Sequence, residues 1–153
     1  MIEKREFADT IRECGPHMYR VAMAILQNSY DAEDAVSEAA LRAYVKAGQL
    51  RKKESMKSWF ISITVNEARK LYAKRKARRE VDSEKECQAV FYDEHHELWD
   101  AVMKLKQEHR EVIVLFYYEG FSIKEIAGIV KVKEGTVKSR LSRAKQQLKE
   151  WIA

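Results

Sequence analysis

The stretch FSIKEIAGIVKVKEGTVKSRLSRAKQQL, residues 121–148, contains two segments with apolar residues at helical spacing, separated by a short turn at 131–133. The first segment opens with a capping box, because Ser122 precedes Glu125 by three residues. In the second segment the apolar residues step by four, three and four positions, so they share one helix face. They are Val137, Leu141, Ala144 and Leu148. The stretch therefore predicts a helix-turn-helix.

The other faces of the second helix present cationic and hydroxyl side chains. Lys and Arg bind phosphates and guanine edges, while Ser and Thr act as short donors. A helix lying in the major groove of DNA uses both kinds of contact. The pattern favours DNA binding over a solvated basic helix in a bundle. The candidate base-edge contacts are Lys138, Ser139, Ser142 and Arg143, and the candidate phosphate contacts are Thr136, Arg140 and Lys145.

The charge of the chain is unevenly distributed. Its 153 residues have a net charge of +5. Residues 46–79 contain 12 basic and 2 acidic residues, whereas residues 80–100 contain 1 basic and 8 acidic residues. Clustered cations of this kind favour a polyanionic partner, with nucleic acid as the first candidate.

Several classes of protein are disfavoured. Cys14 and Cys87 are the only cysteines, which is too few for a disulfide framework or a four-cysteine zinc site. His95, His96 and Cys87 fit no common metal spacing. No signal-peptide pattern is present, and the longest apolar run, Val112–Tyr118, is too short to span a bilayer. We expect a soluble, cytoplasmic protein with no metal, cofactor or small-molecule substrate. No catalytic motif is present, so we expect no enzyme.

Helical periodicity also organises the first half of the chain. We expect a short helix over 3–13, interrupted by Gly15-Pro16, and a second helix to about Asn28. Asp31 is the expected N-cap of a third helix, which ends near Gly48. A basic loop then leads to a long helix that opens at Ser55 or Ser58.

The second half begins after an acidic segment without clear periodicity. We interpret residues 80–93 as a flexible linker between a domain at 1–79 and a domain at 94–153. Val112–Tyr118 is β-branched and aromatic, which favours a strand, but we expect a helix because helical patterns surround it. The predicted fold is all-α: two small helical domains joined by a flexible linker, the second with the helix-turn-helix.

Three blocks, in this order, resemble bacterial sigma factors of the extracytoplasmic-function (ECF) group. DAEDAVSEAALRAYVK, residues 31–46, resembles their polymerase-binding helix. SMKSWFISITVNEARKLYAKRKARR, residues 55–79, resembles the −10 region, and residues 121–148 resemble the −35 region. The resemblance covers nearly the whole chain. One departure is Lys131, which replaces the Gly that the family usually has in the turn. Either Lys131 adopts a positive φ at a cost of roughly 1 kcal/mol, or the turn has a different conformation.

The resemblance implies a specificity subunit that binds core RNA polymerase and promoter DNA and performs no bond chemistry. It also implies an anti-sigma partner. An extruded −10 base must be held in a pocket that offsets the cost of unstacking. The residues implied for −10 DNA are Leu50, Arg51, Met56, Asn66, Arg69, Lys70, Lys74 and Arg75. Those implied for polymerase binding are Asp31, Glu33, Asp34, Glu38, Leu41 and Arg42.

Two other functions remain open from the sequence. One is a transcription regulator that binds DNA through residues 94–153 but never docks on polymerase. The other is a helical interaction protein with no role on DNA. Charge reversal at Asp31 and Asp34 distinguishes the first from a sigma factor, because only a sigma factor needs that helix to bind polymerase.

Overall fold

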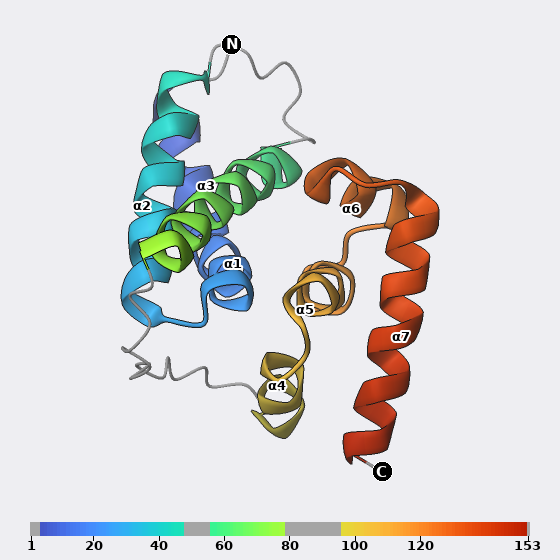
Figure 1. Cartoon of the computed structure of the whole chain (residues 1–153). Helices are drawn as coiled ribbons and strands as arrows, with labels where there is room; N and C mark the ends of the chain where they lie inside the picture. The colour runs from blue at the N-terminus through green and yellow to red at the C-terminus, as the bar shows by residue number, and fades with distance from the viewer. Residues whose placement is uncertain (1–3, 48–55, 79–95, 153) are drawn as a thin grey trace. The chain divides into compact units, whose positions relative to one another are not determined.

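The computed structural model describes residues 4–47, 56–78 and 96–152, and it contains no β-strand in those ranges. The chain divides into two compact units, Met1–Cys87 and Gln88–Ala153, which we call the N-terminal and C-terminal units (Figure 1). The all-α prediction is confirmed. The predicted linker at 80–93 lies outside the described residues, as do Gly48 and Ser55.

The N-terminal unit contains α1 (Lys4–Leu26), α2 (Ser29–Val45) and α3 (Met56–Arg78), each in contact with the other two (Figure 1). Its core is formed by large apolar side chains of α1 and α3, with Met18, Ile25, Phe60 and Ile61 fully buried. The ring of Phe7 makes edge-to-face contact with Phe60 at 5.5 Å, which joins the start of α1 to α3. Such aromatic pairs stabilise a core beyond their buried area.

The inner face of α2 is made of alanines. Ala32, Ala35, Ala39 and Ala43 recur every three or four residues and are all buried. A row of methyl groups lets the backbone of α2 approach both α1 and α3 closely, and a larger side chain there would be overpacked. We call these four residues the alanine seam.

Two boundaries in this unit differ from the sequence prediction. Gly15-Pro16 does not interrupt the first helix, because α1 runs through Pro16. Proline removes one backbone donor from a helix, but buried side chains before and after it, from Cys14 to Ile25, hold both segments against the core. The N-cap of α2 is Asn28 and not Asp31: the Asn28 side chain accepts a hydrogen bond from the Asp31 backbone N–H at 3.0 Å.

The C-terminal unit contains α4 (His96–Met103), α5 (Gln107–Ile113), the π-helical turn η4 (Val114–Tyr118), α6 (Ile123–Val130) and α7 (Glu134–Ile152). The segment with strand propensity is therefore helical, as predicted, although its second part widens to a π-helix. Val112 to Leu115 are buried, so burial of a hydrophobic run decides the structure over local propensity.

Helix α6 begins with the predicted capping box and ends in a left-handed residue. Ser122 and Glu125 form both hydrogen bonds of the capping box, at 3.1 and 2.8 Å. Lys131 ends α6 in the left-handed conformation, with φ 61° and ψ 48°. Of the two alternatives that the sequence left open, Lys131 therefore adopts the positive φ, which makes it a strained position. Gln27, at the end of α1, also has a positive φ of 54°.

Candidate nucleic-acid and polymerase interfaces

Helix α7 has one buried face and one exposed face, as the sequence predicts. Val137, Leu141, Ala144 and Leu148 are buried, and α7 packs on α4, α5 and α6. Of the candidate DNA contacts, five are exposed and two, Thr136 and Arg140, are partly buried. The exposed residues are Lys138, Ser139, Ser142, Arg143 and Lys145. The candidate base-edge contacts thus all lie on the solvent side of α7.

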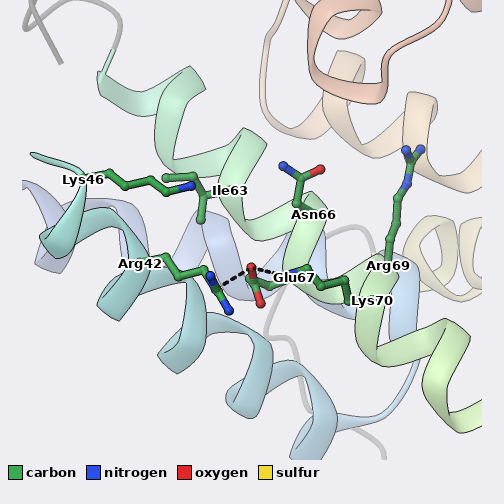
Figure 2. Close-up of a pocket in the computed structure, with 7 residues that line it drawn as sticks. All are labelled: Arg42, Lys46, Ile63, Asn66, Glu67, Arg69 and Lys70. Atoms are coloured by element: carbon green, nitrogen blue, oxygen red, sulfur yellow. Dashed lines mark hydrogen bonds and ion pairs between the residues drawn. The ribbon is translucent and has the colours of Figure 1, made fainter. Parts of the chain in front are cut away.

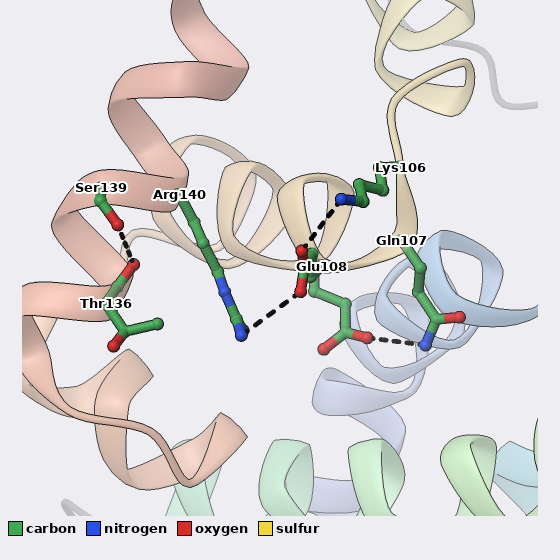
Figure 3. A network of polar contacts seen from close by, with 7 residues as sticks. Lys106, Gln107, Glu108, Thr136, Ser139 and Arg140 are labelled. Atoms are coloured by element: carbon green, nitrogen blue, oxygen red, sulfur yellow. Dashed lines mark hydrogen bonds and ion pairs between the residues drawn. The ribbon is translucent and has the colours of Figure 1, made fainter.

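Arg140 differs from the other cations of α7 because it is tied to α5. Its guanidinium lies 3.4 Å from the Glu108 carboxylate, which also contacts Lys106 at 3.4 Å (Figure 3). The Arg140 side chain is 22% exposed. On α7 itself, the Ser139 hydroxyl donates to the Thr136 carbonyl at 3.2 Å (Figure 3). Glu108 could not be identified from the sequence, since a pairing between α5 and α7 appears only after folding.

Two titratable groups near Arg140 are perturbed. Burial alone would raise the pKa of Glu108, but the Lys106 hydrogen bond and the Arg140 and Lys106 charges outweigh it and lower the pKa. The pKa of His109 is lowered mainly by burial, together with the positive charges of Lys106, Arg143 and Arg140, against the opposing effect of Glu108. Both shifts favour the electrostatic state in which Glu108 is charged and His109 is neutral.

An open pocket of about 420 Å³ lies between α2 and α3 (Figure 2). Its lining combines four cations, one amide, one apolar side chain and one buried carboxylate. These residues are Arg42, Lys46, Ile63, Asn66, Glu67, Arg69 and Lys70. The pocket is large enough for a small molecule or a single base.

The carboxylate of Glu67 joins the two helices at this pocket. It lies 2.9 Å from Nε of Arg42, on α2, and 3.2 Å from Nζ of Lys70, on α3 (Figure 2). Only 8% of the Glu67 side chain is exposed. A carboxylate so buried is costly without charged partners. Glu67 was not among the residues predicted from the sequence. Its one signal there is that it is one of only two acids in the basic block 46–79.

The residues predicted for −10 DNA fall into four groups. Asn66, Arg69 and Lys70 come together at the pocket, while Lys74 and Arg75 lie further along α3 and are exposed. Met56 is 5% exposed and belongs to the core, so its side chain does not face the pocket. Leu50 and Arg51 lie outside the described residues.

The residues predicted for polymerase binding are also divided. Glu33, Asp34, Glu38 and Leu41 are exposed on α2, and the exposed fraction of Leu41 is 62%. Asp31 instead faces α3, where it pairs with Arg75 at 2.8 Å. Arg42 faces the pocket through its pair with Glu67.

No group of metal-ligating side chains occurs among the residues that the structure describes. Within the same ranges, no helix combines the length and apolar character needed to cross a membrane.

Comparison with known protein families identifies both units. Residues 10–79 match the family model "Sigma-70 region 2", and residues 95–148 match "Sigma-70, region 4". The chain belongs to the sigma-70 family of RNA polymerase sigma factors. Within that family it is an alternative sigma factor of the ECF type, which binds core RNA polymerase and directs promoter-specific transcription initiation.

Individual relatives support this placement. The sigma factor SigV of Bacillus subtilis is 33% identical over 82% of this chain and 78% of its own length. The ECF sigma factor SigM of Mycobacterium tuberculosis is 30% identical over 95% of this chain and 76% of its own length. Among solved structures, the sigma factor RpoE of Bartonella quintana, in complex with the anti-sigma factor NepR, superposes with a TM-score of 0.82 at 27% identity. The match covers 95% of this chain and 96% of that one.

These findings decide among the three functions that the sequence left open. A regulator that never docks on polymerase and a helical interaction protein without a role on DNA do not account for matches to both sigma regions. The resemblance noted in the sequence is confirmed as family membership.

Proposed function

We propose that the three surfaces described above divide the work of an ECF sigma factor. The exposed face of α7 recognises the −35 element, the pocket between α2 and α3 receives a base extruded from the −10 element, and the exposed acidic face of α2 docks on core polymerase. The proposed domains are residues 1–79 and 94–153, with 80–93 as the linker.

The observation that carries the proposal is the two-sided construction of α7. Its apolar side is buried against the rest of the C-terminal unit. Its polar side is then presented as a rigid row of donors, of which Lys138 and Arg143 have the length to reach base edges and Lys145 to reach a phosphate. A helix held in this way fits the major groove without rearrangement.

The −10 assignment is supported by the chemistry of the pocket. The Asn66 amide can donate to and accept from the edge of a base, and Ile63 offers an apolar wall. Arg69 and Lys70 at the same pocket, with Lys74 on α3, are placed for the phosphates of a single strand. Several favourable contacts are needed here because extruding a base costs a few kcal/mol.

The polymerase assignment rests on exposed residues of α2. Glu33, Asp34 and Glu38 form an acidic surface beside the apolar side chain of Leu41. A charged rim around an exposed leucine is typical of a protein–protein interface. We assign no bond chemistry to any of these surfaces. A polymerase subunit works at the chromosome, so we place the protein in the cytoplasm.

We also propose regulation by an anti-sigma factor. The RpoE structure that this chain resembles was determined in complex with one, NepR. A partner that covers α2 or α7 would block polymerase or promoter binding. Co-purification of the chain from its native cells, followed by mass spectrometry, tests this regulation.

The main test is run-off transcription with bacterial core polymerase and a library of genomic promoters. New start sites that share spaced −35 and −10 motifs are expected. Arg143→Ala and Asn66→Ala should each reduce the number of start sites. Sequence preference should relax within the −35 motif for Arg143→Ala and within the −10 motif for Asn66→Ala. Starts that are insensitive to both variants would refute the assignment of surfaces.

A further inference from the structure

The pair between Arg42 and Glu67 is unexpected for a residue assigned to polymerase binding. Arg42 comes from α2, yet its Nε lies 2.9 Å from Glu67 on α3, and both residues line the pocket that contains Asn66. The ion pair turns Arg42 away from a purely outward position on α2 (Figure 2).

We propose that Arg42 contacts the edge of the extruded −10 base and that Glu67 is the residue that positions it. This inference rests on the proposed role of the pocket in −10 recognition. It reassigns Arg42 from the polymerase interface to the DNA interface, and it gives a role to a carboxylate that lies in a site for a polyanion.

The chemistry of the guanidinium supports the reassignment. The ion pair occupies the Nε donor of Arg42, and the terminal nitrogens provide further donors in a planar fork. A planar fork is suited to the acceptors on a base edge, and its discrimination depends on orientation. Glu67 fixes that orientation because it is 92% shielded from solvent and accepts from Arg42 at charge-assisted distance.

Attraction of DNA phosphates cannot explain why a carboxylate, Glu67, lies at this pocket. Next to DNA phosphates, a carboxylate lowers affinity through repulsion. The pocket lining holds Arg42, Lys46, Arg69 and Lys70 against this single acid. The carboxylate is explained if it orients Arg42 toward a base, because the gain in base discrimination then offsets the loss of overall affinity for DNA.

The two possible roles of Glu67, reducing the positive charge of the pocket and positioning Arg42, predict opposite results for Glu67→Gln. If Glu67 only reduces the positive charge, the variant binds every DNA more tightly. If Glu67 positions Arg42, the variant loses preference for the correct base, because the amide no longer holds the guanidinium by charge. The quantity that separates the two is a ratio of affinities for DNA with and without the base.

The experiment uses holoenzyme assembled from core polymerase and the full chain. The probe is fluorescent fork-junction DNA with the −10 sequence of a promoter recovered in the run-off experiment, compared with the same DNA carrying an abasic site at the extruded position. Anisotropy titrations give the ratio of the two affinities, and a separate titration gives affinity for core polymerase.

We expect Arg42→Ala and Glu67→Gln each to lower the base-to-abasic ratio by about fivefold or more, the lower end of discrimination by one good side-chain contact. Affinity for core polymerase should be unchanged. Arg42→Lys keeps a cation beside Glu67 but lacks the fork, so it should also lower the ratio while the chain stays folded. This variant serves as the test should Glu67→Gln fail to fold.

The matched control is Asp9→Asn, which neutralises an exposed carboxylate paired with Arg12 on α1, away from the pocket. It makes the same change of charge as Glu67→Gln, and we expect it to leave the ratio unchanged. A general charge effect would instead appear in both variants.

Contrary results are equally specific. Arg42→Ala that weakens core binding and leaves the ratio intact would return Arg42 to the polymerase interface. If Arg42→Ala lowers the affinities for the intact and the abasic DNA equally, Arg42 contacts a phosphate and the proposed base contact is wrong. If Asn66→Ala also leaves the ratio unchanged, the pocket itself is not the −10 site; if Asn66→Ala lowers it and the Arg42 variants do not, only the present inference fails.

Discussion

Nη2 of Arg75 lies 2.8 Å from Oδ1 of Asp31, so an ion pair joins the C-terminal part of α3 to the first turn of α2. The Asp31 side chain is 13% exposed, whereas that of Arg75 is 45% exposed. Asp31 thus belongs to the packing between the two helices, and the neighbouring Asp34 is exposed on the outer side of α2. Two acids predicted to share one role therefore differ in environment.

The first prediction separates these two aspartates. Asp34→Lys should weaken binding to core polymerase without changing the free energy of unfolding, because the side chain is exposed. Asp31→Lys should lower the free energy of unfolding by about 2 kcal/mol or more, since it places two cations together at a mostly buried site. Urea unfolding and a core-binding titration measure the two effects. The double variant Asp31→Lys with Arg75→Asp should recover stability; no recovery would mean that the pair does not contribute.

The second prediction concerns the exposed face of α7. Lys145→Ala should weaken binding of the holoenzyme to all promoters evenly and reduce the salt slope by about one, as expected for a lost phosphate contact. Arg143→Ala should lower the binding free energy by about 1–3 kcal/mol on promoters with the preferred base pair at one −35 position. On promoters in which that base pair is changed, the loss should be small. Titrations over a range of salt concentrations, with promoters substituted at each −35 position, measure both. Equal salt slopes and equal sequence dependence in the two variants would refute the division between a phosphate contact and a base contact.

The third prediction concerns the turn before α7. Lys131 has a positive φ, which costs a residue with a side chain about 1 kcal/mol and glycine almost nothing. Lys131→Gly should therefore stabilise the C-terminal unit by up to about 1 kcal/mol. Lys133→Gly is the matched control: it removes the same charge at a residue without a positive φ, and it should be neutral or destabilising. Thermal unfolding of the two variants makes the comparison.

The fourth prediction is a pH dependence from His109. The pKa of His109 in the folded protein is below the ordinary histidine value of 6.5, so the unfolded chain binds more protons as the pH falls through that range. Stability rises with pH wherever the unfolded state binds more protons. The C-terminal unit should therefore lose stability as the pH drops below about 6.5.

Urea unfolding of the full chain, followed by NMR signals from α5 and α7, measures this dependence. His109→Gln cannot titrate and should flatten the curve between pH 7.5 and 5.5. The pKa of Glu108 is lowered from 4.5, so Glu108 stays charged throughout this range and its own titration lies at more acidic pH. A curve of unchanged slope in the His109 variant would assign the dependence to other groups.

Much of the fold was predictable because its signals are local. The capping box at Ser122 and the buried stripe from Val137 to Leu148 depend on residues a few positions apart. The errors also have local causes. Pro16 looked like a helix break, but burial on both sides of it overrides the proline. Asp31 and Asn28 are equally good capping residues by type, and only the folded backbone selects Asn28.

The sites were less predictable because they depend on pairs between helices. The resemblance of residues 55–79 to the −10 region predicted that Asn66, Arg69 and Lys70 bind the same DNA element, and all three line one pocket in the structure. It could not show that Arg42 and Asp31 face α3, since each is paired with a residue more than 20 positions away. Nor could it show that Met56, the first residue of α3, is buried in the core.

The alanine seam of α2 has a consequence for how this protein can diverge. The buried methyl groups of Ala32, Ala35, Ala39 and Ala43 fix the distance of α2 from its neighbours, so a substitution there displaces the whole helix. Substitutions at Glu33, Asp34 or Glu38 leave this packing intact, because those side chains are exposed. The outer surface of α2 can therefore change its charge while the backbone of the helix keeps its position on α1 and α3.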